Sequence, residues 1–171
     1  MSGEPIAQWF YELAREQDGF EVELVDLAKV NLPLFNEPQN PIRQQYVHEH
    51  TKRWAQIVAR ADALVFVIPE YNHSMNAAMK NAIDYLHIEW RYKPFGLVCY
   101  GGGAKGLRAA QALKPSLVAL KMPFAGELGI GLSTSPVVDG VFKGDEQLDT
   151  SAKALLDELA RLTPLFQSRR T

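Results

Sequence analysis

Residues 65–86 read VFVIPEYNHSMNAAMKNAIDYL, and this stretch decides the expected fold. It begins inside ALVFVIP (residues 63–69), a short apolar run rich in β-branched residues that is typical of a strand covered on both faces. Pro69 ends this strand because proline has no N–H to donate and fixes its own φ. After a polar turn, residues 76–86 predict a helix. The stretch therefore indicates a strand–turn–helix unit of an α/β protein.

The chain before this unit predicts a helix and then a strand. Pro5 suits the first turn of a helix that continues through residues 6–20, and Gly19 suits its exit. The apolar residues at helical spacing are Ile6, Trp9, Phe10, Leu13 and Ala14. Residues 20–28 (FEVELVDLA) alternate apolar and acidic side chains, which predicts a strand with one wetter face.

Strands and helices continue to alternate along the rest of the chain. The other expected elements are a proline-rich loop at 31–41, a helix at 46–61 with Trp54, Ile57 and Val58 inward, a strand at 95–100, a helix at 107–121 with a kink or restart at Pro115, a weaker strand at 122–132, a polar loop at 137–149 and a closing helix at 150–162. This alternation predicts a parallel sheet covered on both sides, in a single domain over residues 1–171.

Composition excludes several classes of function. Apolar residues make up 47% of the 171 residues and charged residues 22%, as in an ordinary globular chain. The net charge of -2 gives no reason to expect nucleic-acid binding. We expect a cytoplasmic protein without a membrane partner, because no apolar run approaches the ~20 residues that cross a bilayer and no secretion signal is recognisable. The single cysteine, Cys99, lies in an apolar run and is expected to be a buried structural thiol.

Two turns stand out because each follows the carboxyl end of a predicted buried strand. They comprise residues 69–74 and residues 100–106. The carboxyl ends of parallel strands meet at one edge of the sheet, and ligands of open α/β sheets bind beyond that edge. We therefore expect the two turns to lie side by side at a binding site.

The first of these turns has the chemistry to bind a flat heteroaromatic ligand. Tyr71 and Asn72 supply an aromatic face, an amide and exposed backbone. Ser74 or Asn76 can cap the following helix, whose first amides favour an anion or an electron-rich atom. The alternative is a plain strand-to-helix connection with a surface tyrosine, and local chemistry does not decide between the two.

The second turn contains the triglycine of residues 101–103, which lets a ligand approach the backbone closely. Together with Gly106 its spacing matches neither the phosphate-loop signature nor the dinucleotide fingerprint. The alternative is a flexible turn. Arg108 follows in the first turn of a helix, where it either holds an anionic partner or is solvated.

No catalytic side chains and no metal ligands are predicted. His48 and His50 flank Glu49, but residues two apart on a helix do not share a face, so a solvated face is favoured over a metal site. No nucleophile–base–acid arrangement is recognisable. The aromatic cluster of Trp90, Tyr92 and Phe95 is expected to pack in the core or against a second subunit.

The stretch PEYNHSMNAAMKNAIDYL closely resembles the PEYN turn and following helix of the NADPH-dependent FMN reductase family, whose members include quinone, azo-dye and chromate reductases. The resemblance extends over nearly the whole chain, through EWRYKPFGLVCYGG, GLRAAQALKP and the early IAQWFYELAREQ, FEVELVDLA and NLPLF. It implies a flavodoxin-like three-layer sandwich that binds FMN non-covalently as a homodimer or homotetramer. By this resemblance the residues that contact or border the flavin ring are Pro69, Glu70, Tyr71, Asn72, Ser74, Tyr100, Gly101, Gly102 and Gly103.

The sequence also departs from the family pattern. The family's first apolar strand and its G-S-x-R-x-x-R-like phosphate turn have no counterpart before Met1, and Ser2 and Gly3 stand about where that turn ends. We therefore expect a fold without its first strand, which would be an interior strand in the order 2-1-3-4-5. Either the chain is clipped relative to the functional protein or it is a divergent form that folds and binds differently.

The resemblance implies an FMN-dependent oxidoreductase. Reduced nicotinamide, NADPH or NADH, would deliver hydride to flavin N5, and two electrons would pass to a quinone-like small-molecule acceptor. The flavin carries this chemistry, which agrees with the absence of a recognisable acid–base constellation. The alternatives are a flavodoxin-like electron-carrier or binding module, and a paralogue that has lost flavin binding.

Overall fold

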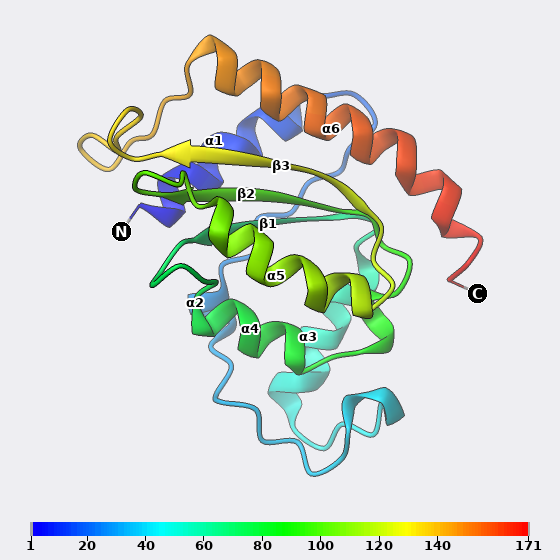
Figure 1. Ribbon diagram of the computed structural model, residues 1–171. Coiled ribbons are helices and arrows are strands. Elements are labelled where there is room, and N and C mark those ends of the chain that lie inside the picture. The colour runs from blue at the N-terminus through cyan, green and yellow to red at the C-terminus, as the bar shows by residue number, and fades with distance from the viewer. Residues whose placement is uncertain (1, 171) are drawn as a thin grey trace.

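A computed structural model describes residues 2–170 and shows a sheet of three parallel strands (Figure 1). β1 spans Leu64–Pro69, β2 spans Phe95–Gly101 and β3 spans Phe124–Gly131, with β2 in the middle. These are the strands predicted from the two buried apolar runs and from the weaker third pattern. The predicted parallel α/β architecture is therefore confirmed.

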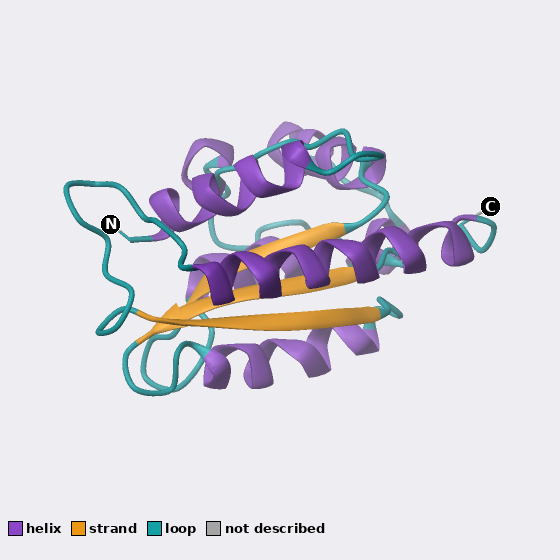
Figure 2. Ribbon diagram, turned by 90° about the horizontal axis from the view of Figure 1, so that it is seen from above, coloured by secondary structure: helices purple, strands orange, loops and turns teal. Residues whose placement is uncertain are grey.

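Helices cover both faces of the sheet. In the described chain they are α1 (Gly3–Glu16), α2 (Leu27–Val30), α3 (Glu49–Arg60), α4 (Ala77–Asp84), α5 (Leu107–Ala119) and α6 (Glu146–Gln167), with 3-10 turns η1 (Pro41–Arg43) and η2 (Ile88–Trp90). α1 and α6 pack on one face, and α3, α4 and α5 pack on the other. Figure 1 shows α5 in front of the sheet and α1 behind it, and Figure 2 shows helices on both sides of the strands.

The central strand contributes side chains to both layers. Phe95, Leu97 and Cys99 pack with α3, α4 and α5, whereas Val98 packs with α1 and α6. All four side chains are fully buried. Burying one large apolar side chain contributes roughly 1.5–3 kcal/mol. The alternation of strand side chains thus joins the two helical layers through β2.

The strand predicted at residues 20–28 is wrong. Residues 20–26 form neither a helix nor a ladder, and the short helix α2 begins at Leu27 with Asp26 as its N-cap. Phe20 and Val22 pack towards α1 and α6, and Val25 packs on the opposite layer. Alternation of apolar and polar residues predicts an extended chain with one wet face, but a strand also needs a hydrogen-bonded neighbour. Within residues 2–170 no strand pairs with this segment or with the outer edge of β1.

The predicted helices are present with shifted ends. α3 begins at Glu49, so the start predicted at residue 46 is wrong, and α6 is longer than expected at both ends. α5 runs through Pro115 without a break, so of the two expected alternatives the restart is wrong. Pro115 is exposed, so the carbonyl that it leaves without an intrahelical partner lies near solvent.

Two buried tryptophans terminate α4. Trp54 Nε1 donates to the carbonyl of Ala82 at 2.8 Å, and Trp90 Nε1 donates to the carbonyl of Ile83 at 3.1 Å. The last carbonyls of a helix lack the usual intrahelical donors, so these indoles supply donors there, and the carbonyl of Ile83 also accepts the amide of Leu86 at 3.3 Å. Trp90 and Phe95 of the predicted aromatic cluster belong to the core, whereas Tyr92 is half-buried and lies outside it.

The long loop before α3 is pinned by the helix that follows the PEYN turn. Asn81 Nδ2 donates to the carbonyl of Pro33 at 2.7 Å, and Asn81 Oδ1 accepts the amide of Phe35 at 2.9 Å. The hydroxyl of Tyr85 donates to Asn36 Oδ1 at 2.9 Å. The NAIDYL part of the family motif therefore orders a loop about 50 residues upstream. The side-chain amide of Asn81 both donates to and accepts from the loop backbone, as the backbone of a neighbouring strand would.

A buried lysine satisfies the C-terminal turn of α3. Lys93 Nζ donates to the carbonyls of Val58 and Ala59, the latter at 2.9 Å. Burial, reinforced by the positive charge of Arg170, lowers the pKa of Lys93 from its ordinary value to about 8. The ammonium therefore stabilises helix carbonyls at the cost of its own hydration.

Candidate functional site

The turn after β1 is a tight reverse turn with unusual backbone. The amide of Tyr71 donates to the carbonyl of Ser74 at 3.1 Å, and the amide of Ser74 donates back to the carbonyl of Tyr71 at 2.9 Å. The two central residues, Asn72 and His73, have φ of 48° and 63°. Positive φ at both central residues defines a type I′ turn, which normally selects glycine or asparagine. The side chain of Tyr71 is 61% exposed beside this turn.

The turn after β2 is folded closely onto the end of its strand. A Cβ atom at Gly101 would lie 3.2 Å from Glu70 Cβ and 3.2 Å from the Gly106 nitrogen. Gly106 has φ of +80°, and a Cβ there would overlap the backbone of Tyr100. Gly102 and Gly103 differ, because a Cβ at either position would have no atom within 4 Å. Packing requires glycine at position 106 and leaves little room at position 101, whereas the inner two glycines border open space.

The two turns lie side by side at the carboxyl edge of the sheet, as the sequence predicts. In the register of the parallel pair, Pro69 lies opposite Tyr100. The amide of Glu70 continues the ladder past the proline and donates to the carbonyl of Tyr100 at 2.9 Å. Pro69, Glu70 and Tyr71 on one side thus border Tyr100 and Gly101 on the other.

The carboxylate of Glu70 has a partner that sequence analysis missed. Glu70 Oε2 accepts the backbone amide of Arg108 at 3.2 Å, and Glu70 Oε1 accepts Arg108 Nη1 at 3.1 Å. The anionic partner of Arg108 is therefore a residue of the neighbouring turn. No local signal could have paired two residues 38 positions apart, although an acidic residue after one strand and a basic residue after the next are compatible with it.

The predicted side-chain cap of α4 is wrong. Asn76 occupies the N-cap position, but neither its side chain nor that of Ser74 accepts a hydrogen bond from the first amides of α4. Ser74 instead closes the type I′ turn through its backbone. Asn76 Oδ1 is buried and has no hydrogen-bond partner among the described residues. A buried acceptor of this kind is expected to meet a donor, and it lies two residues from the turn.

Tyr100 closes the site towards the N-terminus of α1. A Cβ on Gly3 would lie 2.6 Å from the Tyr100 hydroxyl, so a larger residue at position 3 would displace this hydroxyl. Burial, together with the neighbouring phenol of Tyr71, raises the pKa of Tyr100 to about 12. Tyr100 therefore remains a neutral donor at physiological pH. At the start of α1 the amides of Gly3 and Glu4 precede the first intrahelical bond, and Gly3 lies beside the Tyr100 hydroxyl.

These features fit a flavin. A planar ring needs open space beside backbone that side chains do not block, which Gly102 and Gly103 provide. It also needs an aromatic neighbour, which the exposed Tyr71 provides, and hydrogen-bonding groups at its edges. The exposed backbone of the type I′ turn supplies such groups.

The remaining candidates do not form a site. The rings of His48 and His50 stack with centroids 5.1 Å apart, contrary to expectation, because His48 precedes α3 in extended backbone. Both rings bond Asn36. Within residues 2–170 no group of three or more His, Cys, Asp or Glu side chains is placed to bind a metal ion. Cys99 is fully buried, as predicted, and burial raises its pKa to about 12.

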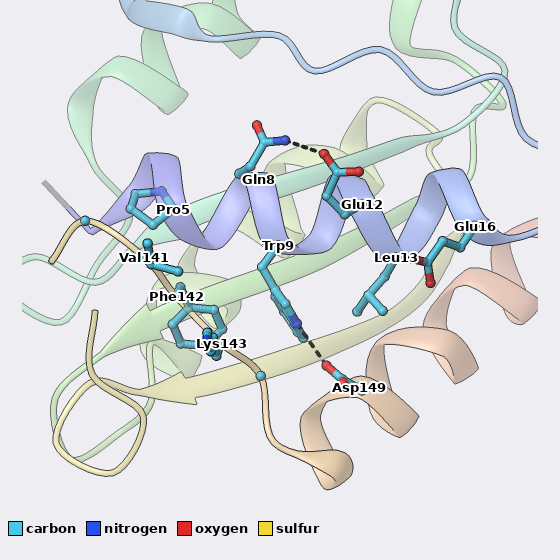
Figure 3. A pocket seen from close by; sticks show the side chains of 12 residues that line it. Pro5, Gln8, Trp9, Glu12, Leu13, Glu16, Val141, Phe142, Lys143 and Asp149 are labelled. Carbon is cyan, nitrogen blue, oxygen red and sulfur yellow. Dashed lines mark hydrogen bonds between the residues drawn. The ribbon is translucent and has the colours of Figure 1, made fainter. Parts of the chain in front are cut away.

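A groove of about 530 Å³ lies between α1 and the loop before α6 (Figure 3). None of the predicted site residues lines it. Four of its polar side chains bond in two pairs: Trp9 Nε1 donates to Asp149 Oδ1 at 2.9 Å, and Gln8 Nε2 donates to Glu12 Oε1 at 2.6 Å. Because these groups already have partners, the groove is better explained as a packing seam between α1 and α6 than as a ligand site.

The fold and the edge site together define a flavodoxin-like protein. FerB from Paracoccus denitrificans, a flavoenzyme NAD(P)H:(acceptor) oxidoreductase, superposes with a TM-score of 0.69 and 20% sequence identity. The match covers 95% of this chain and 91% of that chain. The helices on both faces of the parallel sheet follow the same arrangement, so the flavodoxin-like fold predicted from the sequence is confirmed.

Sequence comparison specifies the family. The model of NADPH-dependent FMN reductase matches residues 2–136. An NAD(P)H-dependent FMN reductase of Schizosaccharomyces pombe is 36% identical over 166 residues, which are 95% of this chain and 82% of that protein. A quinone reductase of Pseudomonas putida is 40% identical over 124 residues, which are 69% of this chain and 63% of that protein. The chain belongs to the NADPH-dependent FMN reductase family, and the predicted class of FMN- and NAD(P)H-dependent oxidoreductase is confirmed.

Proposed function

We propose that the space between the two turns, here called the flavin slot, holds the isoalloxazine ring of FMN. Its proposed lining is Pro69, Glu70, Tyr71, Asn72 and Ser74 on one side and Tyr100, Gly101, Gly102 and Gly103 on the other. The observation that carries the proposal is the hydrogen bond of 2.9 Å from the Glu70 amide to the Tyr100 carbonyl, which fixes the two turns next to each other.

Each part of the slot has a separate role. Gly102 and Gly103 admit the ring to the backbone, and Tyr71 offers it an aromatic neighbour. The neutral hydroxyl of Tyr100 and the first amides of α1 are donors for the polar end of the ligand. When bound, FMN supplies the acceptor for hydride from reduced nicotinamide and the source of two electrons for the substrate. No acid or base of the chain is required for that exchange.

The acceptor is a small molecule of the quinone type. One support is that Gly102 and Gly103 are exposed to solvent, so a second planar molecule can approach the slot there. Another is the similarity to a quinone reductase of Pseudomonas putida. We further propose that residues 1–171 form one domain and act in the cytoplasm as a homodimer or homotetramer. No helix within residues 2–170 combines the length and apolar composition needed to cross a bilayer.

The test is binding followed by turnover. The purified chain is titrated with FMN, and quenching of flavin fluorescence gives the dissociation constant. NADPH is then added with and without a quinone, and its oxidation is followed. We expect a yellow complex and NADPH oxidation that the quinone accelerates. FMN binding without NADPH oxidation would support the electron-carrier alternative instead.

A matched pair of variants locates the binding. Tyr71→Ala removes an exposed aromatic side chain from the slot, and Val118→Ala removes an apolar side chain of similar exposure, 58%, on α5. An aromatic pair contributes about 0.5–1.5 kcal/mol beyond area burial, so we expect Tyr71→Ala to weaken FMN binding up to about tenfold. Val118→Ala should leave it unchanged. Equal affinities of both variants would place the flavin elsewhere.

A further inference from the structure

Glu70 is the residue of the PEYN turn whose side chain points away from solvent. Its side chain is only 10% exposed, whereas that of its partner Arg108 is 52% exposed. The Cβ of Glu70 packs 3.2 Å from the position that a Cβ would take on Gly101. Glu70 therefore lies between the two turns, and its carboxylate reaches past the glycine turn to α5.

α5 has no N-terminal cap of its own. Its N-cap residue is Gly106, which has no side chain to accept the first amides, and its first turn contains no acidic residue. Glu70 supplies both missing elements from another segment: an acceptor for the amide of Arg108 and a negative charge near the positive end of the helix. It also accepts the guanidinium of the same residue, so one carboxylate holds two donors.

The glycine turn is consequently fixed at both ends. At one end Gly101 is the last residue of β2. At the other end Gly106 precedes α5, and its nitrogen lies 3.2 Å from the position that a Cβ would take on Gly101. The carboxylate of Glu70 ties the start of α5 to the end of β1. The exposed residues Gly102 and Gly103 lie between these two fixed points.

We propose that Glu70 is a positioning residue for the flavin slot. By binding Arg108 it fixes the position of Gly102 and Gly103 relative to the Tyr71 turn. Its negative charge also compensates the positive N-terminal end of the α5 dipole. This inference deepens the proposed function, since it assumes that the slot is the flavin site. It assigns Glu70 to the support of the slot, in addition to its backbone contact at the ring.

The midpoint potential of bound FMN distinguishes a positioning role of Glu70 from a purely structural one. Reduced flavin carries more negative charge than oxidised flavin, so a nearby charge changes the ratio of the two forms. Glu70→Gln removes a negative charge and leaves the Arg108 guanidinium and the helix dipole in place, which should favour the reduced form. Arg108→Ala removes a positive charge and leaves the carboxylate, which should favour the oxidised form. The midpoint potential of bound FMN should therefore shift in opposite directions in the two variants.

The experiment combines this potential with hydrogen exchange of the full chain without added flavin. Glu70→Ala loses hydrogen bonds to a charged group, typically worth about 1.5–3 kcal/mol, so amide exchange in residues 101–108 should accelerate about 10- to 100-fold. Glu70→Gln keeps a neutral acceptor and should accelerate it less. The control is Glu23→Gln, which breaks the exposed ion pair between Glu23 and Arg60 away from the slot and should change neither readout.

Each outcome has a distinct meaning. Faster exchange in Glu70→Ala, with opposite potential shifts in Glu70→Gln and Arg108→Ala, supports the proposal. Unchanged exchange in Glu70→Ala overturns it whether or not FMN binds. If exchange is faster in Glu70→Ala but the wild-type chain binds no FMN, Glu70 still holds the glycine turn in place and the proposed function is refuted. Faster exchange with potential shifts of the same sign, or none, overturns positioning and leaves a structural brace.

Discussion

The four glycines of the turn after β2 offer a direct test of the flavin slot, because the structure divides them into two kinds. Gly106 has a left-handed backbone, and a Cβ there would overlap the backbone of Tyr100. Gly102 and Gly103 have neither constraint. If packing were the only reason for glycine in this turn, alanine at position 102 or 103 would change neither stability nor FMN affinity.

The expected stabilities follow from these geometries. A left-handed non-glycine residue costs about 1–2 kcal/mol, and the overlap adds to it, so Gly106→Ala should lose at least about 2 kcal/mol. For a chain of this size that corresponds to a Tm lower by roughly 4–8 °C. Gly102→Ala and Gly103→Ala should leave the free energy of unfolding unchanged or raise it by up to about 1 kcal/mol, because alanine restricts the unfolded chain.

The assay compares thermal unfolding without flavin and FMN affinity by fluorescence quenching for all three variants. A methyl group at Gly102 or Gly103 should separate the ring from the backbone, and we expect at least one of these variants to lose about tenfold in affinity, or 1.4 kcal/mol. Such a loss without any loss of stability can only come from the ligand side. Wild-type FMN affinity in both variants would refute the slot. A loss of stability in either variant would refute the claim that a Cβ at these positions meets no other atom.

Three further predictions concern other parts of the fold. Lys93→Met should abolish a rise in stability between about pH 8 and pH 10: the folded pKa of Lys93 lies below its ordinary value, so in that range only the unfolded chain binds the proton, and deprotonation favours folding. Urea unfolding across this range, compared with wild type, measures the difference. Cys99 should react with a thiol reagent only at the rate of global unfolding, because its thiol is buried with a pKa of about 12; rapid labelling of the native protein would contradict this. His73→Gly should raise the free energy of unfolding by up to about 1 kcal/mol, because glycine tolerates the left-handed backbone; a lower Tm would show that the turn is not strained.

Local patterns predicted the elements whose formation depends on local chemistry. The runs at 63–69 and 95–100 are apolar on both faces, and such runs pack only inside a covered sheet. The adjacency of the two turns also followed from sequence, because parallel strands place their carboxyl ends at one edge. For the segment at 20–28 the same reasoning failed, since pairing depends on a neighbour that alternation does not reveal.

Contacts between distant residues were outside the reach of such patterns. The bond between Glu70 and Arg108 joins the turn after β1 to the start of α5, and neither residue has a local motif that requires the other. The stacking of His48 on His50 depended on the first residue of α3, which periodicity places only to within a few positions. Both errors concern side chains at element ends, where backbone geometry changes within a single residue.

The strained turn and the braced turn have complementary places in the slot. The type I′ turn stores strain at His73, where glycine would be easier to accommodate, whereas asparagine at position 72 suits the left-handed backbone. Strain of this kind persists where surrounding structure holds it, and here the two bonds between Tyr71 and Ser74 do so. The result is an exposed aromatic residue whose backbone is already ordered. Opposite it, Glu70 orders a turn that packing alone would leave free at its centre. Both surfaces of the slot are thus ordered by hydrogen bonds of the protein itself, so a ligand entering the slot would not have to meet the entropy of ordering either turn.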